Sequence, residues 1–312
     1  MAQHRPFRFG VQASTAADAA AWTTLARSVE SMGYSTLTMR DHFGDQLAPV
    51  PALMAAAAAT TTLRVGGLVW DNDYKHPVVL AKELATIDVL SGGRLEIGIG
   101  AGWLASDYKE SGIPYDSNKV RVDRFEEGLT VIKGAMSGEA FSFTGRHYTI
   151  TDYTATPRPV QAPCPPILVG GGGRRVLSIA ARQADIIGIN GTMTAGLVGP
   201  EAIATMTADA VDAKIAIVHS AAGDRIADIE LNIRVFMVRV TDDRQAAIQQ
   251  VADFVQVDPA LVVESPFALI GDPAELVDDL LRRRERWGFS YVVVGAADVD
   301  SFAPVVAELA GK

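Results

Sequence analysis

The stretch from His76 to Trp103, HPVVLAKELATIDVLSGGRLEIGIGAGW, constrains the fold more than any other part of the chain. Apolar residues recur at helical spacing from Val79 to Leu90, which predicts a helix. The run Ser91-Gly92-Gly93 ends this helix, because glycine enters the left-handed region without a steric penalty. Residues 95–100 then predict a short apolar strand, and the Gly100-Ala101-Gly102 loop leaves backbone N–H groups free where it ends. Such N–H groups can hold an anion, above all a phosphate.

The same alternation of helices and short apolar strands runs through all 312 residues without a long linker. Strands that are apolar throughout are typical of a parallel sheet buried on both faces. Their number and spacing predict an α/β fold, a (β/α)8 TIM barrel, as a single domain over residues 1–312. Two looser segments, 104–166 and 256–270, are interpreted as insertions after the fourth and seventh strands. The expected strands are 7–12, 36–39, 63–69, 95–100, 167–169, 185–190, 231–240 and 291–294.

An open doubly wound sheet is the rival architecture, with Gly100-x-Gly102-x-x-Ala105 as a dinucleotide-binding fingerprint. That fingerprint belongs to the first strand–helix–strand unit of a chain, whereas this glycine loop follows the fourth expected strand. Residues 106–118 also lack the pattern of a helix that leads to a strand. The barrel is therefore the favoured prediction.

The charge of the chain argues against a nucleic-acid or membrane partner. The formal net charge is −9, and the one dense basic run, Arg282 to Arg286, is interpreted as the solvated face of a helix. The longest apolar run, 52–59, is too short to cross a bilayer, and the N-terminus lacks the apolar core of a signal peptide. Cys164, the sole cysteine, is interpreted as structural. We expect a cytoplasmic protein that acts on a small molecule.

An aspartate and a histidine, Asp41 and His42, follow the second expected strand directly. The carboxyl ends of the strands form the active face of a TIM barrel. A histidine there can give or take a proton near neutral pH, and the adjacent carboxylate can orient its ring or polarise the site. The alternative is a packing histidine with satisfied hydrogen bonds.

Three other loops at this face carry candidate binding residues. The loop 70–74, which includes Asn72, can line a planar ring or form an ordinary surface turn. Two glycine loops after the fourth and fifth strands indicate backbone approach to one phosphorylated ligand. The arginines at 174 and 175 can attract its charge or be solvated at a helix start. No metal-binding motif is present. The glycine loops comprise Gly100, Ala101, Gly102, Gly170, Gly171, Gly172 and Gly173.

Several segments together resemble the bacterial luciferase-like superfamily, and they span most of the chain. The resemblance implies a TIM barrel that binds a flavin or deazaflavin at the carboxyl ends of its strands. It also implies a bulged third strand with a non-proline cis peptide behind the tricyclic ring, which we place at Leu68–Val69. The segments are 76–103, Gly33-Tyr34, Asp41-His42, Arg121-x-x-Arg124-x-x-Glu127, and Pro166-Ile167 with the glycine loop and residues 180–185.

Within the superfamily, the chain resembles most the coenzyme F420-dependent oxidoreductases, through its GAGW-x-x-x-DY segment (100–108) and its LVWDNDYKHP loop (68–77). Two positions depart from the sugar-phosphate dehydrogenases of this branch. Those enzymes carry a tryptophan shortly after the histidine, where this chain has Gln46, and an acidic glutamate after the glycine loop, where it has Trp103. Their substrate and their acid are therefore not carried over, whereas His42 is.

The resemblance implies hydride transfer between F420 and a small organic substrate, by a protein that forms a homodimer. The two glycine loops would bind the phosphate of the coenzyme, and His42 would move a proton. The residues expected around the ring are Asp41, His42, Leu68, Val69 and Asn72.

Three alternatives remain open at this point. The first is an FMN-dependent monooxygenase that receives reduced flavin from a partner reductase. The second is a non-catalytic carrier of flavin or deazaflavin. The third is an unrelated phosphate-binding barrel, such as an aldolase, which would call for a lysine at a strand end that no expected strand provides.

Overall fold

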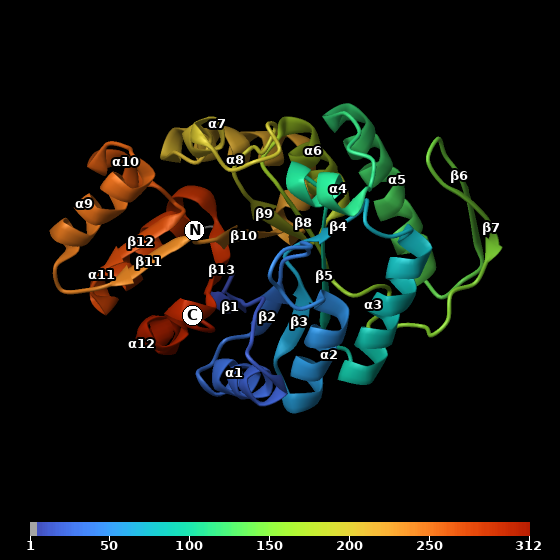
Figure 1. The fold of residues 1–312 in the computed structure, drawn as a ribbon, viewed down its shortest axis with the longest axis horizontal. Helices are drawn as coiled ribbons and strands as arrows, with labels where there is room; N and C mark the ends of the chain where they lie inside the picture. The colour runs from blue at the N-terminus through green and yellow to red at the C-terminus, as the bar shows by residue number, and fades with distance from the viewer. Residues whose placement is uncertain (1–4) are drawn as a thin grey trace.

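The computed structural model describes residues 5–312, and parallel strands form a closed barrel at its centre (Figure 1). The barrel strands are β1 Arg8–Gln12, β2 Thr36–Met39, β3 Arg64–Gly67, β4 Trp70–Asp71, β5 Leu95–Gly100, β8 Ile167–Gly171, β9 Ile186–Ile189, β10 Glu230–Arg234 and β13 Phe289–Gly295. They follow one another as β3-β2-β1-β13-β10-β9-β8-β5, and β5 pairs with both β3 and β4 to close the ring. Because β3 and β4 are two parts of one strand, the ring has eight strands, and the predicted TIM barrel is confirmed.

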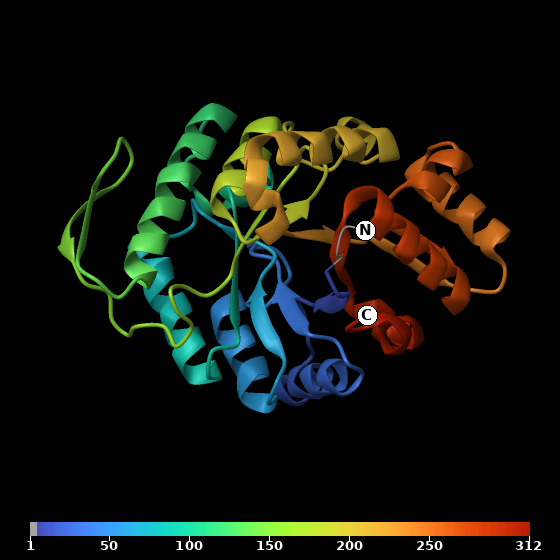
Figure 2. The same ribbon diagram turned by 180° about the vertical axis from the view of Figure 1, so that it is seen from behind.

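Helices surround the barrel on its outside (Figures 1 and 2). The helix before the last strand has a capping box between Asp272 and Glu275 and ends at the left-handed Gly288. The helices around the ring are α1 Ala19–Ser31, α2 Pro49–Ala59, α3 Pro77–Ser91, α5 Asn118–Met136, α6 Arg174–Gln183, α8 Ala208–Ala222, α11 Pro273–Trp287 and α12 Val299–Leu309. Short helices are α4 Ala105–Ser111, α7 Pro200–Ala204, η1 Gly223–Asp228 and η2 Ala296–Asp298.

The third strand is interrupted where the resemblance implied a bulge. The peptide bond between Leu68 and Val69 is cis, and it separates β3 from β4. Glycines on both sides give the bulge room. A Cβ at Gly98 would lie 1.9 Å from the carbonyl oxygen of Gly67. The expected continuous strand 63–69 is therefore wrong in its second half, and the bulge prediction is confirmed.

The expected seventh strand, 231–240, is also two strands. β10 ends at Arg234, and the chain then leaves the barrel to form β11 Met237–Val240, which pairs with β12 Ala268–Gly271. Two helices, α9 Arg244–Val255 and α10 Pro259–Glu264, lie between them. The second insertion therefore begins at β11 and not at residue 256, because β11 finds its partner outside the barrel. Figure 1 shows this unit at the edge of the molecule.

The first insertion is smaller than expected. Within 104–166, α5 packs between α3 and α6 as a regular outer helix, and only the short α4 and a hairpin are additions. The hairpin, β6 Phe141–Thr144 and β7 Thr149–Tyr153, stands beyond α5 in both ribbon views. The segment 106–118 holds the end of α4 and leads into α5, so the expected absence of a helix that leads to a strand is confirmed. The segment 200–222 forms two helices, α7 and α8.

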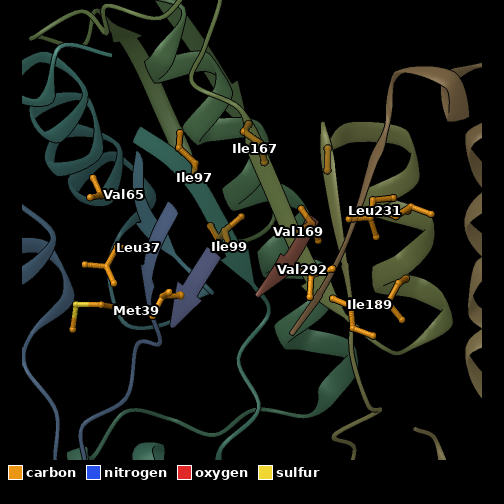
Figure 3. Packing of buried hydrophobic residues seen from close by; sticks show 14 of the residues in the cluster. Leu37, Met39, Val65, Ile97, Ile99, Ile167, Val169, Ile189, Leu231 and Val292 are labelled. Carbon is orange, nitrogen blue, oxygen red and sulfur yellow. The ribbon is translucent and has the colours of Figure 1, made fainter. Parts of the chain in front are cut away.

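The main hydrophobic core lies between the barrel and its helices. Figure 3 shows side chains of neighbouring strands, including Leu37, Ile97 and Val169, gathered on this outer face of the sheet. The barrel interior is polar at its amino end, where Arg8 binds Glu96 and Glu230 at 2.7 and 2.6 Å. This ion cluster closes the amino end, so the open end is the carboxyl one. Among residues 5–312, none of the helices has the length and apolar character needed to cross a membrane.

Candidate active site

A cavity of about 370 Å³ opens among the loops at the carboxyl ends of the barrel strands. It brings together most of the residues predicted from the sequence, although they come from four strand ends along the chain. Those that line it are Asp41, His42, Leu68, Val69, Gly100, Ala101, Gly102, Gly170, Gly171, Gly172 and Gly173.

Asn72 is the predicted residue that the structure places elsewhere. It is 1% exposed, and its side-chain amide lies 3.4 Å from the hydroxyl of Tyr148, behind the cavity and against Gly128 of α5. Its backbone N–H donates to the carbonyl of Gly100 at 3.1 Å. Asn72 therefore ties the bulged strand to β5 and, unlike the other predicted ring neighbours, does not line the cavity.

His42 is held by a carboxylate that is distant in the sequence. Its Nδ1 lies 2.6 Å from Oδ2 of Asp107, which α4 carries. The same oxygen accepts a hydrogen bond from the hydroxyl of Tyr74 at 2.9 Å, and the ring of Trp103 packs edge-on against the imidazole at 5.7 Å between centroids. Since Asp107 accepts at Nδ1, the other ring nitrogen, Nε2, is left to give or take a proton at the cavity.

Asp41 does not orient the ring of His42, although this was one of the two roles predicted for its carboxylate. Its Oδ2 accepts a hydrogen bond from the backbone N–H of Asp71 at 3.3 Å. Burial raises the pKa of Asp41. Asp41 thus ties the end of β2 to β4 and lines the cavity beside His42.

Asp71 is the most perturbed carboxyl group of the cavity. It is 7% exposed and accepts hydrogen bonds from the hydroxyl of Tyr108 at 3.0 Å and from the backbone of Asp73 at 2.8 Å. Burial raises the pKa of Asp71 to about 7, and the negative charge of Asp73 adds to the rise. Asp73 itself is paired with Arg124 through two contacts of 2.7 and 2.9 Å. Near neutral pH, Asp71 can therefore be protonated or ionised.

We expect Asp71 to make the protein less stable as pH rises from about 4 to about 7. Its pKa is higher in the folded chain than in the unfolded chain, so the folded state binds the extra proton in this range and loses that advantage above it. Asp71→Asn should remove about 2–3 kcal/mol of the fall in unfolding free energy between pH 5 and pH 8. Urea unfolding of wild type and variant at pH 5 and pH 8 measures this difference in unfolding free energy. The exposed Asp45, changed to Asn, is the control, and equal slopes for Asp71→Asn and wild type would contradict the assignment.

Val69 lies between the two glycine loops. A Cβ at Gly100 would be 2.7 Å from Cγ2 of Val69, and a Cβ at Gly170 would be 3.0 Å from its Cγ1. Gly172 is equally restricted, because a Cβ there would lie 2.4 Å from the carbonyl oxygen of Asn190. These glycines are therefore required by close packing, in addition to any contact with a ligand.

The second glycine loop leads into α6, whose N-terminus faces the cavity. Gly173 is the N-cap, and none of the side chains in residues 5–312 caps this helix end. The first N–H groups of the helix are therefore available to an anion. The N-terminus of α5 lies beside it, since Arg175 donates to the carbonyl of Lys119 at 3.5 Å. Two helix N-termini thus converge at this side of the cavity.

Three arginines that the sequence did not indicate as binding residues also line the cavity. Arg121, from α5, is 3% exposed, and its Nε has no hydrogen-bond partner in the described part of the chain. Arg40 and Arg234 line the opposite side. By contrast, Arg175 is paired with Asp123 and Glu126 outside the cavity. The position of Arg234 at the end of a short strand was the sequence signal that could have identified it as a cavity residue.

The single cysteine has no role in this cavity. Cys164 lies at the outer core, and burial raises the pKa of its thiol to about 12. A thiol in that state is a poor nucleophile, which agrees with the structural interpretation.

Comparisons with known proteins agree with this architecture. An FMNH2-dependent dimethylsulfone monooxygenase from Pseudomonas putida is 35% identical over 143 residues, which are 46% of this chain and 39% of that protein. An F420-dependent glucose-6-phosphate dehydrogenase from Beutenbergia cavernae is 31% identical over 176 residues, 54% of this chain and 51% of that protein. The chain spans about half the length of the curated relatives it matches.

The fold itself recurs over the whole chain in a solved structure. The coenzyme F420-dependent tetrahydromethanopterin reductase from Methanopyrus kandleri superposes with a TM-score of 0.78 over 98% of both chains, at 18% identity. The family model for luciferase-like monooxygenases matches residues 4–268. The resemblance read from the sequence is confirmed by this match, and the chain belongs to the luciferase-like monooxygenase family.

Proposed function

We propose that this chain is an oxidoreductase that binds coenzyme F420 in the barrel cavity and transfers hydride between it and a small organic substrate. The observation that carries the proposal is the position of His42, which is held by Asp107 and stands at the same cavity as Val69 and the two glycine loops. A proton-transferring group and a binding surface for a ring and a phosphate are thereby combined in one site.

The residues present fit such a coenzyme. The glycines at 100 and 170 leave the side chain of Val69 uncovered on the cavity side, as a flat apolar surface for a ring. The unpartnered Nε of Arg121 and the uncapped α6 offer donors for a phosphate, among the residues that the structure describes. Gly170 to Gly173 and Arg121 would therefore hold the phosphate, and Leu68, Val69 and Ala101 would contact the ring.

One feature favours F420 over FMN, whose tail ends at its phosphate. The tail of F420 continues beyond the phosphate with carboxylates, which calls for positive charge outside the cavity. Arg174, at the start of α6, is exposed and forms no ion pair within residues 5–312. Arg174 follows Gly173, which lines the cavity, so a longer anionic tail that leaves the cavity here would meet its positive charge.

When bound, the deazaflavin supplies or accepts a hydride at a ring carbon. Asp107 accepts the Nδ1 proton of His42 and so fixes which ring nitrogen faces the reaction. His42 then gives a proton to the substrate, or takes one from it, at Nε2. The ring of Trp103 packs at a right angle against the imidazole and helps to hold its orientation.

A comparative titration with F420 and FMN tests the proposal. We expect the protein to quench the fluorescence of F420 with a dissociation constant at least tenfold below that for FMN. Arg174→Gln should weaken the binding of F420 and leave that of FMN unchanged, because only the longer tail reaches this side chain. Tight binding of FMN with no binding of F420 would replace the proposal with that of an FMN-dependent monooxygenase.

A further inference from the structure

A second group of cations lies across the barrel from the glycine loops. In the ring of strands, β5 and β8 are neighbours, and β1, β2 and β10 are on the opposite side. The two glycine loops lie at the carboxyl ends of β5 and β8. The side chains of Gln12, Arg40 and Arg234 come from the ends of the other three and line the same cavity. The cavity therefore has two cationic sides, one at Arg121 and one at Arg234.

Arg234 is held in place by neutral groups. Its Nε donates to Oε1 of Gln12 at 3.2 Å, and Gln12 donates in turn to the carbonyl of Leu68 at 2.8 Å. Its guanidinium carbon lies 5.4 Å from the centroid of the Phe236 ring. Gly295 leaves it space, since a Cβ there would come within 3.1 Å of Nη2. The side chain is thus oriented before any ligand binds.

The charge of Arg234 is offset only in part, by the carboxylate of Asp298. Its Nη1 is buried without a hydrogen-bond partner, and no carboxylate within residues 5–312 forms an ion pair with it. Burial lowers the pKa of Arg234 to about 10, the charge of Asp298 acts against this, and the charge of Arg40 adds to it. A half-buried cation with an unpartnered nitrogen and no ion pair is costly, and an anion that enters the cavity would offset the cost.

The carboxylates of the cavity do not serve as that partner. Asp41 accepts the backbone N–H of Asp71, and Asp71 accepts the hydroxyl of Tyr108. The guanidinium of Arg40 is exposed at the cavity and also forms no ion pair in the described part of the chain. Two guanidinium groups that form no ion pair in the described part of the chain therefore face the space that the ring and the phosphate would leave to a substrate.

We propose that the substrate of this enzyme is a small organic anion, whose carboxylate, sulfonate or phosphate group binds Arg234 and Arg40. The proposal rests on the proposed function, because it assigns the glycine side of the cavity to the coenzyme and the arginine side to the substrate. The planar fork of Arg234 suits two parallel hydrogen bonds to one oxyanion group.

Binding of a charged probe and a neutral probe of nearly equal size tests the proposal. Methanesulfonate and dimethyl sulfone are both tetrahedral at sulfur and differ in charge. Their dissociation constants are measured by ligand-observed NMR, first on the protein without coenzyme and then with saturating F420 or FMN, whichever binds. We expect methanesulfonate to bind at least about tenfold more tightly than dimethyl sulfone in both states. The comparison of probes does not depend on which coenzyme binds, so the proposed function can fail while this result stands.

Variants locate the bound anion. Arg234→Gln should weaken methanesulfonate binding about 10- to 100-fold, as expected for a lost charge-assisted hydrogen bond, and the exposed Arg40→Gln should weaken it several-fold. The control is Arg239→Gln on β11, an exposed arginine outside the cavity, with an expected change below about twofold. Circular dichroism melting confirms that each variant is folded. Equal affinity for the two probes, or loss of binding in Arg121→Gln with none in Arg234→Gln and Arg40→Gln, would overturn the proposal.

Discussion

Replacing His42 with asparagine lowers kcat by a factor of about 10²–10⁴ and changes coenzyme affinity by less than about threefold, because the loss is that of one proton-transferring group. The imidazole stands at the cavity, and its Nδ1 is already occupied by Asp107. The asparagine keeps a polar side chain of similar length but cannot titrate. Steady-state kinetics with any substrate that the wild-type enzyme turns over, together with a coenzyme titration, measure the two effects.

Two further variants define the role of His42. His76→Asn is the matched control, because His76 caps α3 at the surface and asparagine is a good N-cap, so turnover should be unchanged. Asp107→Asn should lower kcat less than His42→Asn and move the pH profile of kcat, since Asp107 acts through the ring it orients. Wild-type turnover in His42→Asn would contradict the catalytic assignment.

Gly102→Ala should destabilise the protein by about 3–5 kcal/mol and abolish coenzyme binding, through backbone strain and overpacking together. The added Cβ would lie 1.9 Å from the hydroxyl of Tyr108 and 2.6 Å from the carboxylate of Asp71. Its backbone is also left-handed, with φ of +73°. Both neighbours are buried, so the loop must move away from the cavity. Urea unfolding and the F420 titration measure the two losses.

Gly112 separates the two causes of this effect. It also has a left-handed backbone, with φ of +77°, but no atom of residues 5–312 lies within 4 Å of an added Cβ. Gly112→Ala should therefore cost only the backbone strain, about 1–2 kcal/mol, and leave coenzyme binding intact. Equal losses in the two variants would show that packing beneath the glycine loop does not maintain the cavity.

The barrel was predictable because each of its elements is encoded locally. The helix and strand around Gly92 follow from apolar spacing and a glycine stop, and the same pattern recurs along the chain. The division at Arg234 was not predictable in this way. Residues 231–240 read as one apolar run, and they separate because β11 pairs with β12, about 30 residues further along.

The sequence predicted where most residues of the candidate site lie, but not which side chains hold them in place. His42 was found because it follows a strand, but its partner Asp107 is 65 residues away on a short helix with no strong pattern of its own. The glycine loops were predicted as binding loops because consecutive glycines after a strand are a strong signal. Close packing against Val69 explains part of this need for glycine. Arg121 is buried on a helix, and spacing alone does not reveal that it faces a cavity.

The crystal structure of the protein with F420 is the most direct test of the two-sided cavity. We predict that the ring packs on Val69 beside His42, that the phosphate is bound at the N-terminus of α6 near Arg121, and that Arg234 remains free for the substrate. A phosphate bound at Arg234, or a ring away from Val69 and His42, would contradict this assignment.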